Sequence, residues 1–407
     1  MANSLTPVDV YAIMNTLAGQ LIGKDVLAAV DPSSFATVGQ AVLATGYENT
    51  LDALGTMIGR TFIAVRPYKG EFNSIERTYD EFGAISRKIS FFSKFAEAAQ
   101  DWNTQLASTQ LDDGKTVDHY KINKVYPLEI QFTGLKVYQK SYTRFRRQLK
   151  VAFSNETEFA KFVEGMAVEI ANEMELLREV ENRMLVLNRI GANIQKTTNS
   201  MSINLTTAYN VKFGTTLKTK DLLTTNLSDF LKFFVATLKN TSRAMTKMTT
   251  DFHITPAKNN DDGRAMTLLR HTPRDLQRLI VSAPFWTDAE SYVFPEIFND
   301  KYLKIENFEA VAYWQNPDSP LAINLKNVNI LNPTTGQSTN GAAVNESTVL
   351  AILYDRDALS TNYYLDDVVT TPVNAAGDYY NTFYHVARQF RDDQTENACV
   401  FYMKDTD

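Results

Sequence analysis

The sequence of 407 residues has a single cysteine, Cys399, and only 17 glycines. One cysteine excludes a disulfide within the chain, which points to a reducing compartment or to a fold that needs no disulfide. Scarce glycine disfavours sites in which bare backbone amides cradle a phosphate. Cys399 lies within an apolar segment near the end of the chain, so we expect a buried, inert thiol rather than a nucleophile.

Catalytic motifs are also missing. The chain has no GxxxxGK[ST] phosphate loop, no GxGxxG fingerprint, no GxSxG elbow and no HExxH zinc motif. None of the four histidines has a second histidine or a cysteine at metal-ligand spacing: His119, His253, His271 and His385. We therefore predict no catalytic residue, no cofactor or cofactor-binding residue and no metal ligand, and we expect a protein that is not an enzyme.

Long hydrophobic runs do not occur either. No stretch approaches about 18 uninterrupted apolar residues, and residues 1–30 lack the basic start and apolar core of a signal peptide. The formal net charge is −6, so no overall attraction to nucleic acid or to an anionic membrane is expected. With 44% hydrophobic residues the chain can bury a large core in two or three folding units, and we expect a soluble protein made inside a cell.

The most informative feature that is present is helical periodicity from Ser154 to Gln195. Apolar residues recur at steps of three or four with glutamates between them, and Asn155 and Glu158 have capping-box spacing at the start. A helix of roughly 40 residues is about 60 Å long, more than a compact domain of this size needs. It suits an elongated subunit that its neighbours complete, although a bundle or coiled-coil helix is the open alternative.

The apolar spacing within this helix also predicts which face is covered. We expect Met174 and Leu177 to be buried, because they continue the apolar stripe. Glu175 and Glu179 fall between the apolar positions, so we expect them to be largely exposed.

Residues 70–135 lack such periodicity and predict an extended two-stranded arm. Ile85–Phe92 and Leu128–Phe132 resemble strands, and Asp112-Asp113-Gly114 between them is a good reversal. The second strand alternates apolar and polar residues, which indicates one buried and one solvated face. An isolated hairpin is only marginally stable, so we expect this arm to be mobile until it lies on something.

Other segments carry weaker signals. Helices are expected at 4–30, 38–60, 228–248 and from Pro273 to Ala283, and strands at 135–151, 308–314, 321–330, 349–354 and 398–403. Six cations and no acid occur from Lys136 to Lys150, whereas residues 355–407 hold ten acids and four cations. Opposite patches suit head-to-tail contact between copies. Pairing within one subunit, solvation, and phosphate binding by the basic segment are the alternatives.

Asp355 and Asp357 flank Arg356 directly after an apolar, strand-like run. Paired carboxylates can bind a divalent cation or perform acid–base chemistry. A turn with local Arg–Asp pairing explains the same pattern, and we prefer that interpretation.

In this order of elements the chain resembles the major capsid protein of tailed bacteriophages, which has the Hong Kong 97-type α+β fold. The resemblance rests on the N-terminal arm, the two-stranded loop with Asp112-Asp113-Gly114, the strand that leads into the long "spine" helix, and the segment Leu353–Leu359. That segment resembles the hydrophobic–Asp–basic–Asp–Ala–aliphatic turn common in such head proteins. The likeness covers nearly the whole chain in layout and gives no lysine–asparagine pair for crosslinking.

The resemblance implies five parts. These are an N-terminal helical arm at 1–60, an extended two-stranded loop at 61–135, a peripheral domain at 136–260 with the spine helix at 155–195, an axial domain at 261–355, and a return to the peripheral domain at 356–407.

It also implies a major capsid protein that self-assembles as hexamers and pentamers into an icosahedral shell around double-stranded DNA. The implied place is the virion, after assembly in the host bacterial cytoplasm. Implied partners are copies of itself, a portal, and scaffold or decoration proteins; DNA would line the inner face without sequence-specific binding, and no membrane is involved. Two alternatives stay open, an encapsulin-like bacterial compartment shell and, from a different class, an intracellular metal-dependent enzyme using Asp355 and Asp357.

Overall fold

The computed structural model describes residues 7–22, 28–46, 49–50, 53, 68–77, 85–92, 120, 125–147, 150, 153, 156–196, 200–259, 263, 265–292 and 308–405. The chain forms two compact units. Unit 1 comprises residues 1–85, 133–182 and 361–390, and unit 2 comprises residues 86–132, 183–360 and 391–407. This division into two units does not test the five predicted parts, so the peripheral and axial domains and their borders stay predictions.

Two N-terminal helices begin unit 1, α1 (Pro7–Leu21) and α2 (Pro32–Ala44). The first lies within the expected segment 4–30, whereas the second begins before the expected segment 38–60. Asp31 caps α2, because its Oδ1 accepts a hydrogen bond from the Ser34 amide at 2.7 Å while the Asp31 amide donates to Ser34 Oγ. The two helices share an apolar cluster that includes Phe35, and Phe153 and Phe159 at the start of the long helix pack into it.

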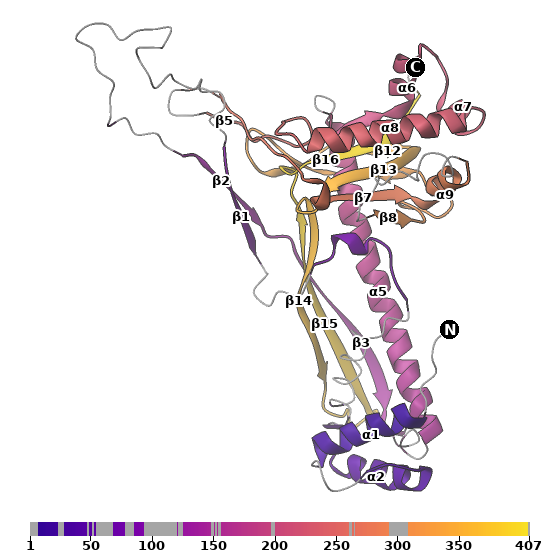
Figure 1. Cartoon of the computed structure of the whole chain (residues 1–407). Helices are drawn as coiled ribbons and strands as arrows, with labels where there is room; N and C mark the ends of the chain where they lie inside the picture. The colour runs from indigo at the N-terminus through magenta and orange to yellow at the C-terminus, as the bar shows by residue number, and fades with distance from the viewer. Residues whose placement is uncertain are drawn as a thin grey trace. The chain divides into compact units, whose positions relative to one another are not determined.

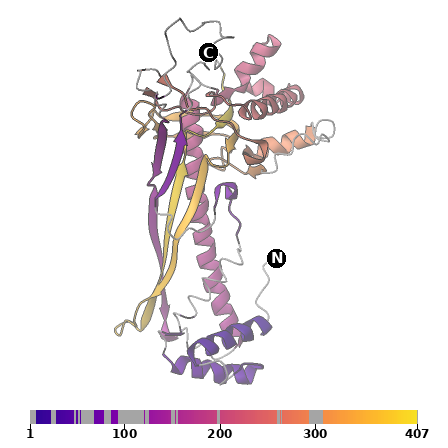
Figure 2. The same ribbon diagram turned by 60° about the vertical axis from the view of Figure 1, so that its left-hand side comes forward.

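A three-stranded sheet forms most of the rest of unit 1, in the order β14 (Leu359–Thr370), β15 (Tyr379–Asp392), β3 (Leu135–Phe145). β3 and β15 are antiparallel, from Leu135 opposite Gln389 to Phe145 opposite Tyr379. Figure 2 shows these strands beside the first part of the long helix. The strand expected at 135–151 is therefore confirmed for its first eleven residues.

The long helix, α5 (Glu156–Gln195), is continuous over 40 residues, which confirms the prediction from periodicity. Its residues up to Asn182 belong to unit 1, and those from Arg183 belong to unit 2. Gly191 does not end it: an added Cβ there would lie 2.8 Å from side-chain atoms of Leu325 and Val328, so glycine permits close packing. The predicted cap residue Asn155 lies outside the described residues.

Unit 2 is built on a five-stranded sheet in the order β4 (Ser202–Asn204), β16 (Ala398–Met403), β13 (Thr348–Asp355), β7 (Gln277–Ser282), β8 (Phe308–Val311). The central strand β13 runs antiparallel to both neighbours, and all eight of its residues are buried. Helix α8 (Leu227–Met245) packs on this sheet through Phe230 and Phe234 (Figure 1). The apolar run at 349–354 forms the buried strand that its composition predicted.

Shorter elements complete unit 2. These are α6 (Leu205–Phe213), α7 (Thr219–Leu223) and α9 (Ala283–Tyr292), with the two-stranded pairs β9–β12 (Ile323–Leu325, Val344–Glu346), β10–β11 (Asn329–Leu331, Ser338–Asn340) and β5–β6 (Lys258–Asn259, Ala265–Met266).

Two predictions of secondary structure need correction. The helix expected from Pro273 to Ala283 is wrong: a 3₁₀ turn, η2 (Arg274–Leu276), is followed by strand β7. Pairing with the buried strand β13 decides the outcome, since Leu279, Ile280 and Val281 suit a strand buried on both faces. The single strand expected at 321–330 is two short strands, β9 and β10.

The predicted arm strands are confirmed as the antiparallel pair β1 (Ser86–Phe91) and β2 (Pro127–Phe132). Both belong to unit 2, whereas residues 68–77 belong to unit 1. The reversal predicted at Asp112-Asp113-Gly114 lies outside the described residues.

Candidate functional site

The carboxyls of Asp355 and Asp357 have protein partners within unit 2. Asp355 is buried; its Oδ2 accepts a hydrogen bond from Thr272 Oγ1 at 2.7 Å and its Oδ1 accepts one from the Asp357 amide at 2.8 Å. Burial raises the pKa of this carboxyl. Asp357 instead points to Arg356 and Arg391, at 3.7 and 4.0 Å. Among the residues that the structure describes, no three acidic, histidine or cysteine side chains are grouped to hold a metal. The turn with local Arg–Asp pairing is what the structure shows.

Behind Asp355 a chain of buried polar side chains continues inward. Thr272 Oγ1 accepts a hydrogen bond from Asn397 Nδ2 at 3.2 Å, and Asn397 Oδ1 lies 3.1 Å from His253 Nδ1. The other ring nitrogen of His253 lies 2.9 Å from the carbonyl oxygen of Leu268. Burial lowers the pKa of His253, and both ring nitrogens already have protein partners. This series of hydrogen-bonded side chains therefore joins backbone segments of unit 2 and presents no acid or base to a substrate.

Cys399 is buried, as expected, and His385 is partly buried. Cys399 lies opposite Leu353 in the β13–β16 pair, is fully buried, and has a pKa raised by that burial. The ring of His385 stacks on Phe383 with an angle of 8° between the planes. His119 lies outside the described residues.

The basic segment pairs with acids of its own unit. From Tyr138 onward, residues at even positions of β3 are partly buried and those at odd positions are exposed. Three cation–acid pairs within unit 1 follow: Lys136 Nζ with Glu181 Oε1 at 3.0 Å, Lys140 Nζ with Glu173 Oε2 at 3.3 Å, and Arg146 Nη1 with Asp378 Oδ1 at 3.2 Å. Pairing within one subunit thus accounts for half of the six cations that suggested a contact between copies.

A strap of residues 68–77 lies on the polar face of α5 in unit 1. The Gly70 amide donates to Glu175 Oε1 at 2.7 Å, and the Tyr68 hydroxyl donates to Glu179 Oε2 at 2.8 Å. Arg178 of the helix pairs with Glu175 and donates a hydrogen bond from Nη2 to Asn73 Oδ1 of the strap at 2.7 Å. The strap, which includes the 3₁₀ turn η1 (Asn73–Ile75), therefore gives this face of the helix its partners.

The prediction of which face of α5 is buried is wrong between Met174 and Met184. Glu175 and Glu179 are only 8% and 5% exposed, while Met174 and Leu177 are only partly buried. Leu176, Val180 and Met184, spaced four apart, are 52%, 52% and 60% exposed. The described subunit covers a polar stripe of the helix and leaves an apolar stripe open.

Strand β1 repeats this inversion in unit 2. Lys88 Nζ donates to Asp393 Oδ2 and to Glu396 Oε1. Arg270 donates from Nη2 to Ser90 Oγ at 2.8 Å and pairs with Glu396 at 3.4 Å. Polar residues of β1 thus face the subunit.

Apolar residues of β1 face outward. Ile89 and Phe91 are 59% and 60% exposed, and Ile85 just before the strand is 63% exposed. Phe92, at the end of the strand, is the apolar residue that turns inward, into a small cluster with Met266 and Leu268. On β2 the order is the usual one, with Leu128 and Ile130 partly buried and Glu129 exposed, so the inversion is confined to β1.

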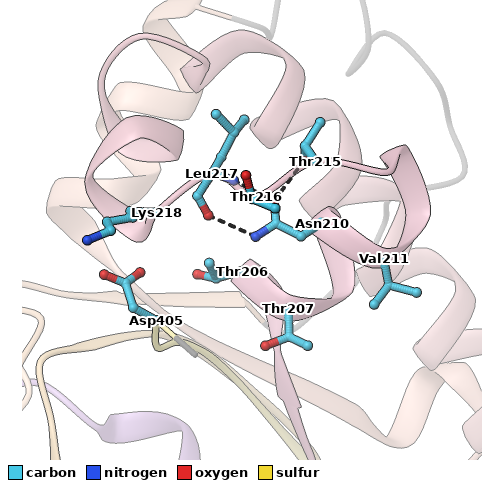
Figure 3. A pocket seen from close by; sticks show the side chains of 9 residues that line it. All are labelled: Thr206, Thr207, Asn210, Val211, Thr215, Thr216, Leu217, Lys218 and Asp405. Atoms are coloured by element: carbon cyan, nitrogen blue, oxygen red, sulfur yellow. Dashed lines mark hydrogen bonds between the residues drawn. The ribbon is translucent and has the colours of Figure 1, made fainter. Parts of the chain in front are cut away.

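A surface cavity of about 350 Å³ lies beside α6 in unit 2 (Figure 3). Asn210 on its wall donates from Nδ2 to the Leu217 carbonyl at 2.8 Å and accepts from Thr215 Oγ1 at 2.8 Å. Asp405 accepts a hydrogen bond from the Thr219 amide at 2.6 Å, and this bond lowers the pKa of the carboxyl. These groups hold the loop after α6 in place, and their arrangement points to no reaction.

Sequence patterns did not single out Lys88, Asp393, Glu396 or Arg178. The available signal was the placement of Lys88 and Ser90 between Ile89 and Phe91, which gives β1 a polar face and an apolar face. Alternation does not say which face is covered.

No helix in the described parts of the chain combines the length and hydropathy needed to cross a membrane.

Comparison with known proteins adds a family and a fold. A model of the Phi29-like phage major capsid protein family matches residues 11–402. The capsid structure of Staphylococcus phage Andhra is similar over 84% of this chain and 86% of that chain, with 11% identity and a TM-score of 0.53. A structure of the head fiber and inner core protein gp22 of native bacteriophage P68 is similar over 84% and 86%, with 10% identity and a TM-score of 0.50. No curated protein matches the chain.

Proposed function

Because the chain belongs to the Phi29-like phage major capsid protein family and has the Hong Kong 97-type fold, we propose that its copies assemble as hexamers and pentamers into an icosahedral head shell around double-stranded DNA. The match over residues 11–402 is the observation that carries this proposal. It confirms the resemblance drawn from the order of elements. Neither the encapsulin-like shell nor the metal-dependent enzyme is supported.

Family membership implies a structural protein of the virion. We propose that the chain has no catalytic role and that assembly takes place in the cytoplasm of the host bacterium. The buried, partnered state of Asp355 and His253 supports the first point, since neither side chain faces a substrate site.

Two open apolar surfaces support assembly from copies of this chain. The α5 stripe of Leu176, Val180 and Met184 and the outward side of β1 with Ile89 and Phe91 would cost free energy if left in water. Both lie on elements whose other side is already used within the subunit. We propose that neighbouring copies cover them in the shell.

Other partners follow from the same family. We propose that a portal and scaffold or decoration proteins contact the shell, and that packaged DNA lies against its inner wall without sequence-specific binding. The net charge of −6 and the pairing of Lys136 and Lys140 with acids of their own unit support weak, non-specific contact with phosphate.

Sedimentation and negative-stain microscopy of the purified chain, alone and with its assembly partner, test the proposal. We expect megadalton particles, or rings of five or six copies of the 45.9 kDa chain. A protein that stays monomeric or dimeric under every such condition, including in purified particles, would contradict it. Val180→Asp should prevent assembly while the subunit remains folded, and Val211→Asp, the same change at an exposed position of α6 outside the two surfaces, serves as the matched control.

A further inference from the structure

The inward side of β1 makes a continuous series of contacts with its own unit. Lys88 reaches Asp393 and Glu396, and Ser90, two residues on, accepts a hydrogen bond from Arg270. Phe92, two residues further, is 5% exposed. The strand is therefore attached first by an ion pair, then by a hydrogen bond from a guanidinium group, then by apolar packing.

The carboxylates that receive Lys88 are deeply placed. The side chains of Asp393 and Glu396 are 1% and 11% exposed, and that of Lys88 is 21% exposed. Burial opposes the charged form of Asp393, but Lys88 and hydrogen bonds from Thr395 outweigh it and lower the pKa of the carboxyl. Arg270 also pairs with Glu396. Withdrawing Lys88 would leave a buried carboxylate at Asp393 without its cation, which is strongly unfavourable.

A second ion pair on the same strand offers a contrast. Arg87 points to the outward side, where it pairs with Glu129 of β2 at 3.0 Å. Their side chains are 62% and 44% exposed, so water competes for both charges and the pair contributes little. The adjacent cations Arg87 and Lys88 thus differ in burial, and only the loss of Lys88 leaves a buried carboxylate without its cation.

We propose that Lys88 is a positioning residue for assembly: by bridging two buried carboxylates of its own subunit, it fixes the direction of the β1–β2 pair within unit 2 before any neighbouring copy binds. The inference rests on the proposed function. It replaces the expectation that these strands become ordered only on assembly. The outward residues Ile89 and Phe91 are then presented in a fixed geometry, and part of the ordering entropy is lost during folding rather than during association.

Amide hydrogen exchange of the free subunit tests the attachment. Lys88→Met should raise exchange in β1 and β2 by about tenfold or more, while exchange in the central strand β13 stays unchanged. Arg87→Met removes the same charge from the outward side and should leave exchange in both strands at the wild-type level. Lys88→Arg keeps a cation and should retain most of the protection.

Particle shape tests the positioning role. Lys88→Met should give irregular or open particles in electron micrographs, whereas Arg87→Met and Lys88→Arg should give shells of normal diameter. If Lys88→Met does not fold, Glu396→Gln replaces it, because Lys88 then keeps one carboxylate and the same loosening is expected in weaker form.

Unchanged exchange in the Lys88 variant, or equal loosening by Arg87→Met, would overturn the inference. Normal shells from a Lys88 variant whose strands have loosened would also overturn it. Failure of the wild-type chain to assemble would count against the proposed function alone, because the exchange measurement on free subunits still decides whether Lys88 fixes the strands.

Discussion

The sheet of unit 2 and the contact between α5 and the sheet of unit 1 bury different kinds of side chain. In unit 2, the central strand β13 places Leu350, Ile352 and Leu353 in an interior of apolar side chains. In unit 1, α5 meets the sheet through charged side chains, such as Arg388 on Glu181 at 3.2 Å, each about 3% exposed. An apolar interior tolerates any neighbour of suitable volume, whereas a buried ion pair tolerates only its partner. The sheet of unit 2 thus depends on apolar packing at β13, whereas the contact between α5 and the sheet of unit 1 depends on matched charged partners.

The largest effect is expected in the apolar interior. Leu350→Ala should cost about 4 kcal/mol of unfolding free energy in unit 2, because the removed atoms leave a cavity in the centre of the sheet. Denaturant unfolding followed by exchange in β13 measures it. Leu135→Ala, at a half-exposed end of β3, should cost far less. Similar losses for the two leucines would show that β13 is not the core of unit 2.

A somewhat smaller loss is expected in unit 1, and it should be reversible. Arg388→Met should cost about 3 kcal/mol, because Glu181 keeps a buried charge with only the half-exposed Lys136 beside it. Adding Glu181→Leu should recover most of this loss, since both buried charges are then gone. A double variant as unstable as the single one would mean that packing, not charge, holds this contact.

The strap on α5 should show the same principle at one position. Glu179→Ala should cost about 1–3 kcal/mol, because the Tyr68 hydroxyl loses its acceptor and the site is buried. Val180→Ala, next to it on the exposed apolar stripe, should change the free subunit by less than about 0.5 kcal/mol. Thermal unfolding of free subunits compares the two. The opposite ranking would restore the orientation that periodicity predicts.

The smallest effect concerns pH and the polar chain inside unit 2. The pKa of His253 is lowered from its ordinary value of 6.5, so the unfolded chain binds this proton more tightly than the folded one. Stability should therefore rise with pH up to about 6.5 and then level off, by on the order of 1 kcal/mol. His253→Asn should flatten this dependence, and His271→Asn, at an exposed position, should not. An unchanged profile in the His253 variant would show that other groups cause it.

Elements whose local pattern and tertiary surroundings agree could be predicted from the sequence. The length of α5, the buried strand β13 and the pair β1–β2 follow from periodicity and composition. The segment Gln277–Ser282 could not be assigned this way, because its pairing with β13 links residues 70 or more positions apart.

The open apolar surfaces explain the remaining error. Periodicity locates an apolar stripe on α5, but it does not say whether the same subunit or another one covers that stripe. In the described subunit, Glu175 and Glu179 face residues 68–77, and Val180 faces outward. The contact of Lys88 could not be predicted for a related reason, because Asp393 lies 305 positions away in the sequence. Burial that depends on distant segments or on other copies leaves little local signal.

The single thiol gives the molecule a built-in chemical reporter. Cys399 is completely buried between β13 and its neighbours, and its raised pKa keeps it in the unreactive thiol form. A thiol-specific dye can therefore modify only those molecules in which the β13–β16 pair has separated, so the labelling rate counts opening events of unit 2. A cysteine introduced at an exposed position such as Val180 would carry a fluorophore to one defined place, with the native thiol silent.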